Sequence, residues 1–228
     1  MRIIIVRHGD PNYERDCLTD LGRKQAEAAA VRLMDEGIEK IYSSCLGRAK
    51  ETAEVFSEMS GIRPIYVLDF MREIRFGYGE ALYESGNPWD EADKTATEGK
   101  DLLDPAWREL PFFKENAATQ DVDLVCRETD NWMRELGYER EGHYYRCVKT
   151  DEQEHTVALF CHGGSGTAML SRIFNLPFPY LCGIIRMPHT AITIIRMEKS
   201  KDSKIMPVLE LACDARHIQN IEDDEDTE

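Results

Sequence analysis

The sequence contains no long hydrophobic run. A helix that spans a membrane needs about 20 mostly apolar residues, whereas the first apolar run covers only residues 3–6 and leads straight into Arg7 and His8. The hydrophobic region of a cleavable signal peptide, roughly 7–15 residues long, is also longer than this run. We therefore expect a cytoplasmic protein that has no membrane partner.

Cysteines are few and scattered. The chain has 7 of them, an odd number, and no two are separated by only two residues. Zinc sites and redox motifs commonly use Cys-x-x-Cys pairs, and disulfide frameworks use an even number of cysteines in short secreted chains. The sequence thus indicates neither a metal site nor disulfide bonds, and we expect no metal and no other cofactor.

Positive charge is in deficit. The 28 Lys and Arg residues face 43 Asp and Glu residues, so the formal net charge is -15 and the pI is about 4.9. Such a surface repels nucleic acid and anionic membranes, so we expect neither as a partner. Part of the charge lies in residues 221–228, which we predict to be a disordered acidic tail. The sequence carries no signal for an oligomeric state.

Length and hydrophobic pattern predict an α/β fold. A chain of 228 residues can bury one sizeable core. We predict three αβα layers with a central, mostly parallel mixed sheet, a single domain over residues 1–220, and a helical cap insertion at residues 81–155. The pattern places strands after the first one near residues 39–43, 65–68, 156–161, 191–197 and 205–211. It places helices at about residues 19–36, 48–59, 121–136 and 166–174.

Three predicted strand ends carry side chains suited to holding an anion. Residues 3–6 lead into Arg7 and His8, a second apolar run leads into His162, and a third places Arg48 near the start of a helix. Ligands collect at the carboxyl ends of strands in open α/β sheets. If the strands are neighbours, these side chains converge on a volume the size of a phosphate group. Each residue taken alone could instead be an ordinary surface side chain.

Two arginines and two histidines suit phosphoryl transfer, which is helped by positioning and by cationic or N–H donors. Arginine is always charged and can hold two phosphate oxygens at once. One histidine can attack phosphorus to form a phosphohistidine, while the other donates a hydrogen bond to the transferring oxygens. This scheme requires no metal.

The leaving alkoxide must be protonated, and Glu73 and Glu80 follow the predicted strand at residues 65–68. A general acid at neutral pH needs a pKa raised by burial or by nearby negative charge. The ordinary alternative for Glu73 is a salt bridge with Arg72 or Arg75.

Five separated motifs occur in an order that resembles a known family. They are Arg7-His8-Gly9, Leu18 to Ala26, Ser43 to Ala53, Glu73 with Phe76, Gly77 and Glu80, and His162-Gly163-Gly164. Together they resemble the histidine phosphatase superfamily, also called phosphoglycerate mutase-like proteins.

The resemblance implies roles for residues at the matching positions. His8 corresponds to the phosphate acceptor, Arg7, Arg48 and His162 to the phosphate pocket, and Glu73 to the proton donor. Further substrate contacts are expected from Gly163 of the last motif and from two residues whose correspondence is looser. These are Asn12, in the loop after the first motif, and His189, which stands where relatives often carry Asn.

We expect a metal-independent phosphomonoester hydrolase that acts through phospho-His8 on a small phosphorylated metabolite. Sugar phosphates, nucleotide loop precursors, phosphoglycerates and phosphoproteins all satisfy this chemistry. One alternative is phosphoglycerate mutase-type transfer, which must exclude water; family mutases usually have a longer and more basic insertion. Another is a non-catalytic phospho-ligand binding protein, although every residue that catalysis needs is present. The insertion is expected to set substrate choice, with one or two of residues 142–146, a group that includes His143 and Arg146, reaching the pocket.

Overall fold

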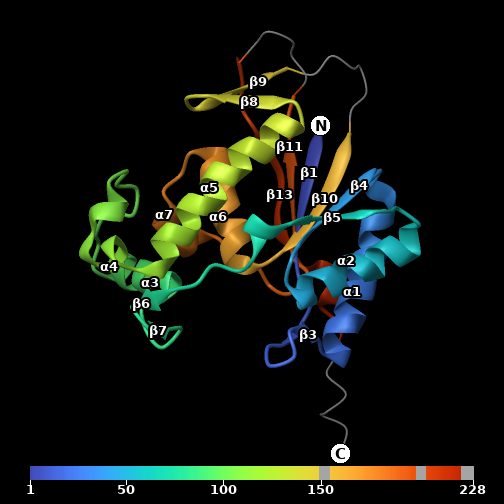
Figure 1. The fold of residues 1–228 in the computed structure, drawn as a ribbon, viewed down its shortest axis with the longest axis horizontal. Coiled ribbons are helices and arrows are strands. Elements are labelled where there is room, and N and C mark those ends of the chain that lie inside the picture. The colour runs from blue at the N-terminus through green and yellow to red at the C-terminus, as the bar shows by residue number, and fades with distance from the viewer. Residues whose placement is uncertain (149–154, 199–203, 222–228) are drawn as a thin grey trace, which may run out of the picture.

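A six-stranded mixed sheet forms the centre of the molecule in the computed structural model, which describes residues 1–148, 155–198 and 204–221 (Figure 1). The strand order is β13-β11-β1-β10-β4-β5, and β1, β10, β4 and β5 run parallel, whereas β11 is antiparallel to both of its neighbours. The strands are β1 (Arg2–Arg7), β4 (Lys40–Ser44), β5 (Ile65–Leu68), β10 (Thr156–Cys161), β11 (Ile192–Arg196) and β13 (Val208–Asp214). The predicted α/β class and mostly parallel sheet are confirmed.

Helices cover both faces of this sheet. Ile4 and Val6 of β1 pack with α1 (Asp20–Leu33) and α2 (Gly47–Ser60), while Ile3 and Ile5 point to the opposite face. That face is covered by α5 (Ala117–Glu135), α6 (Gly163–Phe174) and α7 (Phe178–Ile184). Burial on both faces explains why β1 is a continuous apolar run rather than an alternating one.

Helix α1 begins and ends at the residues that its sequence indicates. The Thr19 hydroxyl accepts a hydrogen bond from the Gly22 N–H at 3.0 Å, which satisfies one of the free donors of the first turn. The helix continues into a short 3-10 turn, η1 (Met34–Glu36), and stops at Gly37, whose φ of +67° is readily adopted by glycine.

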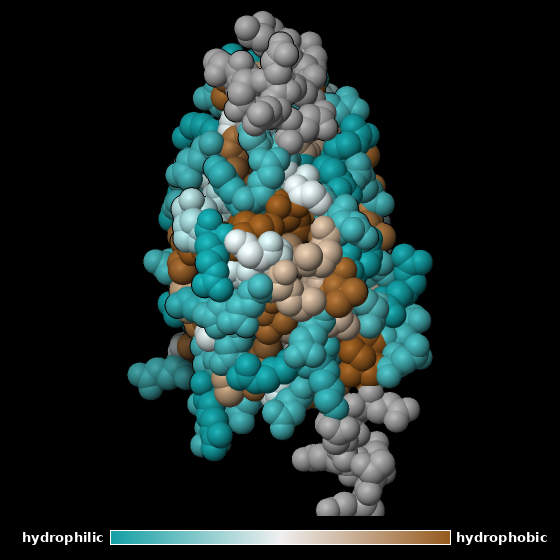
Figure 2. Space-filling model, turned by 90° about the vertical axis from the view of Figure 1, so that its right-hand side faces the viewer, coloured by the Kyte–Doolittle hydropathy of each residue, from teal (hydrophilic) through white to brown (hydrophobic). Residues whose placement is uncertain are grey.

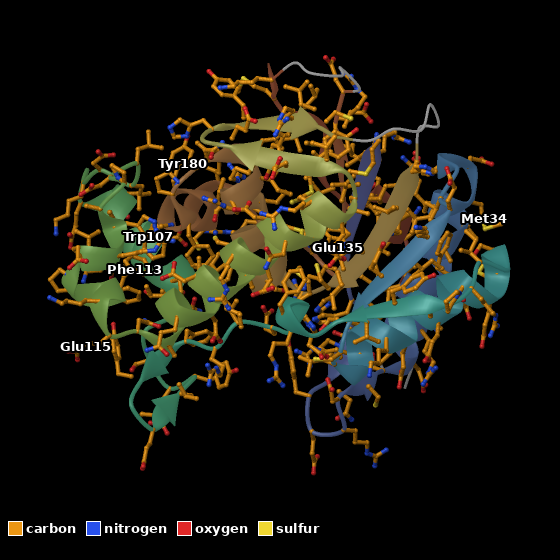
Figure 3. All side chains as sticks on the ribbon, turned by 45° about the horizontal axis from the view of Figure 1, so that its top comes forward. Met34, Trp107, Phe113, Glu115, Glu135 and Tyr180 are labelled. Atoms are coloured by element: carbon orange, nitrogen blue, oxygen red, sulfur yellow. The ribbon has the colours of Figure 1, made fainter. Side chains whose placement is uncertain are left out.

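A helical lobe lies to one side of the sheet (Figure 1). It contains β6 (Gly77–Tyr78), β7 (Ala81–Leu82), α3 (Pro88–Thr97), η3 (Trp107–Glu109) and α4 (Pro111–Lys114). Trp107 and Phe113 lie side by side in it (Figure 3), with ring centroids 5.0 Å apart in an edge-to-face arrangement. Trp107 also contacts Phe178 of α7, so aromatic packing joins the lobe to the helices on the sheet.

Two expected elements differ in the structure. The strand expected at residues 205–211 is two strands, because β12 (Lys204–Ile205) pairs with a hairpin outside the main sheet and Pro207, which has no N–H, precedes β13. That hairpin, β8 (Tyr138–Glu141) and β9 (Tyr144–Cys147), lies in the insertion that was expected to be helical. The remaining short elements are β2 (Pro11–Asn12), β3 (Cys17–Leu18), η2 (Asp69–Met71) and η4 (Arg216–Ile218).

The face of the molecule drawn in Figure 2 is mostly hydrophilic. Seen from the side on which β5 and α2 lie, it shows hydrophobic residues gathered near its centre within a polar surround (Figure 2). No helix in the part of the chain that the structure describes could cross a membrane. Of the tail expected at residues 221–228, residues 222–228 lie outside the described residues. The division into a domain at 1–220 with an insertion at 81–155 stays a prediction.

Candidate active site

The carboxyl ends of β1, β4 and β10 bring the expected side chains together. The ring centroid of His8, directly after β1, lies 5.1 Å from that of His162, directly after β10. The guanidinium Nε of Arg48, in the first turn of α2, lies 3.4 Å from His8 Nε2. Parallel neighbouring strands place their ends at one edge of the sheet, and this is why residues far apart in the sequence meet here.

His8 is oriented as a nucleophile. Its Nδ1 lies 2.7 Å from the Gly9 carbonyl oxygen, which can only accept a hydrogen bond, so the network assigns the ring proton to Nδ1. Nε2 then carries a lone pair and accepts from Arg48. Burial, together with the charges of Arg7 and Arg48, lowers the pKa of His8 to about 3, so the ring is neutral near pH 7.

Arg48 and Arg7 are held by different partners, a carboxylate and a backbone carbonyl respectively. The Arg48 guanidinium pairs with Asp16, and the other carboxylate oxygen of Asp16 accepts from the Gly47 N–H at 2.7 Å. Arg7 donates through Nη1 to the Met187 carbonyl, while its Nε is buried and has no hydrogen-bond partner among the described residues. A buried donor without a partner is costly, so this N–H is available to an anionic ligand.

His162 is fixed through Ser44. The Ser44 hydroxyl oxygen lies 2.8 Å from His162 Nε2 and accepts from the Leu46 N–H at 3.3 Å. Ser44 can therefore donate its own proton to Nε2, which leaves the ring proton on Nδ1. His162 Nδ1 is buried and has no partner among the described residues, like Arg7 Nε. Burial and the neighbouring His8 keep the pKa of His162 well below its usual value.

Glu73 lies at the N-terminus of α6. Its carboxylate oxygens accept from the backbone N–H groups of Ile74 at 2.9 Å, Ser165 at 3.0 Å and Gly164 at 3.3 Å. These bonds and Arg7 favour the charged form, yet burial outweighs them and raises the pKa of Glu73. A carboxyl group near Arg7, with a raised pKa, has the property that a general acid needs.

Gly164 is required by the close approach of Glu73. A Cβ atom on Gly164 would lie 2.5 Å from Glu73 Oε1 and 2.5 Å from Ile74 Cγ1, whereas a Cβ atom on Gly163 would meet nothing closer than Arg7 Nε at 3.8 Å. We expect Gly164→Ala to lower the free energy of unfolding by about 1–3 kcal/mol, as overpacking does. It should also reduce turnover, because the carboxyl group must move.

The matched control is Gly163→Ala in the same helical turn. It should leave the melting temperature unchanged or slightly raised, since Ala is the better helix former. Equal melting temperatures for the two variants in thermal denaturation would contradict the argument from close packing.

His189 and Asn12 occupy different surroundings. The His189 ring lies 5.8 Å from that of His8, and its Nδ1 is 3.5 Å from Asp10 Oδ1. Burial and the charge of Arg7 lower the pKa of His189 to about 4, against the opposing effect of Asp10. The Asn12 side-chain oxygen accepts from the Arg15 N–H at 3.1 Å within its own loop. The structure thus brings His189 close to His8. Substrate binding by His189 or by Asn12 stays a prediction.

A pocket of about 860 Å³ adjoins this centre. It shares Arg48 and Glu73 with the cluster around His8. Its other lining residues are mostly aromatic and aliphatic, including Tyr13, Phe76 and Tyr83, and they also include the charged residues Arg72, Arg75 and Asp121. In the described ranges, no group of three or more His, Cys, Asp and Glu side chains could hold a metal ion.

The expectation that one or two of residues 142–146, including His143 and Arg146, reach the pocket is wrong, because none of them lines it. The β8–β9 hairpin lies near the amino end of β1, at the opposite end of the sheet from His8 (Figure 1). The Tyr138 hydroxyl of β8 donates to the Met197 carbonyl at 3.4 Å, and Met197 itself pairs with Met1. Arg146 forms ion pairs with Glu139 and Glu141 instead.

Sequence reasoning missed two supporting residues. Ser44 and Asp16 orient His162 and Arg48, and neither was singled out. The Ser-Ser pair at the end of β4 was a visible signal for Ser44. Asp16 offered none, because its pairing depends on how the loop between β2 and β3 folds over α2.

Comparisons with known proteins agree with this geometry. A sequence model of the histidine phosphatase superfamily (branch 1) matches residues 3–125. A glucosyl-3-phosphoglycerate phosphatase of Mycolicibacterium vanbaalenii is 29% identical over 205 residues, which cover 80% of each chain. A probable phosphoglycerate mutase, GpmB, of Yersinia enterocolitica is 28% identical and covers 96% of this chain and 95% of its own.

Solved structures show the same fold. The mycobacterial glucosyl-3-phosphoglycerate phosphatase Rv2419c is 26% identical, with a TM-score of 0.61 and coverage of 92% of this chain and 97% of its own. A phosphoserine phosphatase mutant from Entamoeba histolytica, in complex with phosphoserine, is 19% identical, with a TM-score of 0.62 and coverage of 95% and 98%. The second likeness concerns the fold alone.

Proposed function

This chain belongs to the histidine phosphatase superfamily, branch 1, and from that membership we propose that it is a metal-independent phosphomonoester hydrolase acting on a small phosphorylated metabolite. The observation that carries the proposal is the orientation of His8. Its proton is assigned to Nδ1 and its Nε2 faces Arg48, so the nitrogen that would attack phosphorus is unprotonated. The named activities of the relatives, phosphatases and probable mutases, support the same chemistry.

In the first step, His8 Nε2 attacks phosphorus and the bond from phosphorus to the ester oxygen breaks. Arg7, Arg48 and His162 hold the phosphoryl oxygens, and the free N–H groups at Arg7 Nε and His162 Nδ1 supply two of the donors. Glu73 gives its proton to the departing alkoxide and becomes a carboxylate.

In the second step, water attacks phospho-His8 and Glu73 takes a proton from that water. The bond between nitrogen and phosphorus breaks, inorganic phosphate leaves, and Glu73 is again protonated. The enzyme thus returns to its starting state with one ester bond hydrolysed. Mutase chemistry differs only in the acceptor of the phosphoryl group, which is a second hydroxyl of the bound molecule. It is the second candidate because the probable mutase GpmB is similar to this chain over nearly its whole length.

The test is hydrolysis of p-nitrophenyl phosphate and a panel of natural phosphomonoesters in EDTA. We expect inorganic phosphate to be released and an acid-labile phosphoryl adduct to appear on His8 by mass spectrometry. Absence of phosphate release from every ester would overturn the proposal. Phosphoglycerate interconversion that requires 2,3-bisphosphoglycerate, without net hydrolysis, would instead establish the mutase.

A further inference from the structure

We propose that the substrate's alcohol carries an aromatic or similarly flat apolar group, which binds against the rings of Tyr83 and Phe76 in the pocket beside Glu73. This inference rests on the proposed hydrolysis and adds the chemical class of the substrate. It follows from the position of the pocket, from its charges and from the backbone of Tyr83.

The pocket begins where the leaving group must lie. Arg48 and Glu73 line it, so the group attached to the oxygen that Glu73 protonates extends into this space. Its volume of about 860 Å³ falls within the roughly 300–1,000 Å³ of pockets that hold drug-sized ligands. A three-carbon alcohol would leave most of it filled with water.

The pocket has few free charges beyond the phosphate site. Arg75 is bound to Asp121 through Nε at 3.0 Å and Nη2 at 2.7 Å, so the two charges neutralise each other. Among the described lining residues, Arg72 is the one cation without an ion-pair partner, and its side chain is exposed. A small, highly charged substrate finds no cluster of cations here, whereas apolar surface is plentiful.

Tyr83 adopts a backbone conformation that bulky residues seldom adopt. Its φ is +67°, and its N–H donates to the Phe76 carbonyl at 2.9 Å. Such a conformation persists only where the surroundings enforce it, and it clusters at ligand sites. Its ring meets that of Phe76 edge to face, with centroids 5.1 Å apart.

The strained backbone of Tyr83 holds its side chain in an exposed position, where the ring can contact a ligand. The residue is 55% exposed although it lines the pocket, so much of its ring lies open to a ligand. Burial of the remainder and the nearby Glu73 carboxylate raise the pKa of Tyr83, which agrees with a phenol close to the proposed acid. A flat apolar group bonded to the leaving oxygen would cover this exposed surface.

The test compares 2-phenylethyl phosphate with ethyl phosphate, because both leave as primary alkoxides that need the same protonation. We expect kcat/KM to be about 10–100-fold higher for the phenylethyl ester, the gain typical of burying one ring. Tyr83→Ala should reduce this ratio to near one, and Tyr83→Phe should retain it. Tyr144→Ala, an exposed tyrosine on the β9 hairpin at the other end of the sheet, is the control and should change neither rate.

Calorimetric binding of 2-phenylethylphosphonate and ethylphosphonate gives a readout without turnover, and Phe76→Leu is a second pocket variant. Equal affinities for the two phosphonates, an unchanged ratio in Tyr83→Ala, or preferential hydrolysis of 3-phosphoglycerate would overturn this inference. If no ester, including those of the natural panel, is hydrolysed but the phenylethyl phosphonate binds more tightly, the inference stands and the proposed hydrolysis fails.

Discussion

His8→Ala should abolish turnover, with kcat falling by about 10⁴–10⁶-fold, as when the nucleophile of a covalent mechanism is removed. No other described side chain presents an unprotonated nitrogen to Arg48, so no substitute nucleophile is available. Phosphate release measures the loss of turnover, and mass spectrometry of the quenched enzyme measures the loss of the phosphoryl adduct. The adduct should vanish together with turnover.

The control for this variant is His143→Ala, because His143 is an exposed histidine on the hairpin far from the site. It should keep full activity and the same adduct. Enzymes whose nucleophile has been removed keep far less than about 1% of their activity. Turnover by His8→Ala above that level would therefore show that another group attacks phosphorus.

Glu73→Gln should slow hydrolysis of alkyl phosphates by about 10²–10⁴-fold, the usual contribution of a positioned general acid. p-Nitrophenyl phosphate should be affected far less, since p-nitrophenolate leaves without protonation. Glutamine has nearly the same shape, and its single amide oxygen can still accept from the N–H groups of Ile74 and Ser165, which share Oε1 of Glu73. Glu80→Gln is the matched control because Glu80 is exposed in the same segment.

The pH dependence of kcat distinguishes the proposed general acid, Glu73, from the proposed nucleophile, His8. Burial raises the pKa of Glu73, and the acid form exists below that pKa, so kcat for alkyl esters should fall as the pH rises through it. This decline should disappear in Glu73→Gln. The pKa of His8 is about 3, so its neutral form is complete well below neutrality and contributes no change between about pH 5 and 8. A decline of the same size in Glu73→Gln would assign it to another group.

Local patterns in the sequence were sufficient for the elements that lie at the core. The apolar run of β1 predicts a strand buried on both faces, and Thr19 with Gly37 brackets α1, because caps and hydrophobic periodicity act through residues near in the chain. The motifs around His8, Arg48, Glu73 and His162 likewise identified which residues meet, since each follows or opens an element at the same sheet edge.

The insertion was predicted less well for a physical reason. The tyrosines and cations of residues 142–146 are the types that bind phosphoesters, and only the pairing of β9 with β8 and β12 places them at the far end of the sheet. Strand pairing of this kind depends on partners distant in sequence, so composition alone does not determine it.

The sequence by itself thus determined the fold class, the family and the side chains that gather around His8, because those follow from short-range patterns and motifs. Only the tertiary structure decided what orients and surrounds them. Ser44 meets His162 across 118 positions, Ser165 holds Glu73 across 92, and Tyr83 lies exposed on the pocket wall at positive φ. These contacts arise from packing between distant elements, whose free energy no local segment contains.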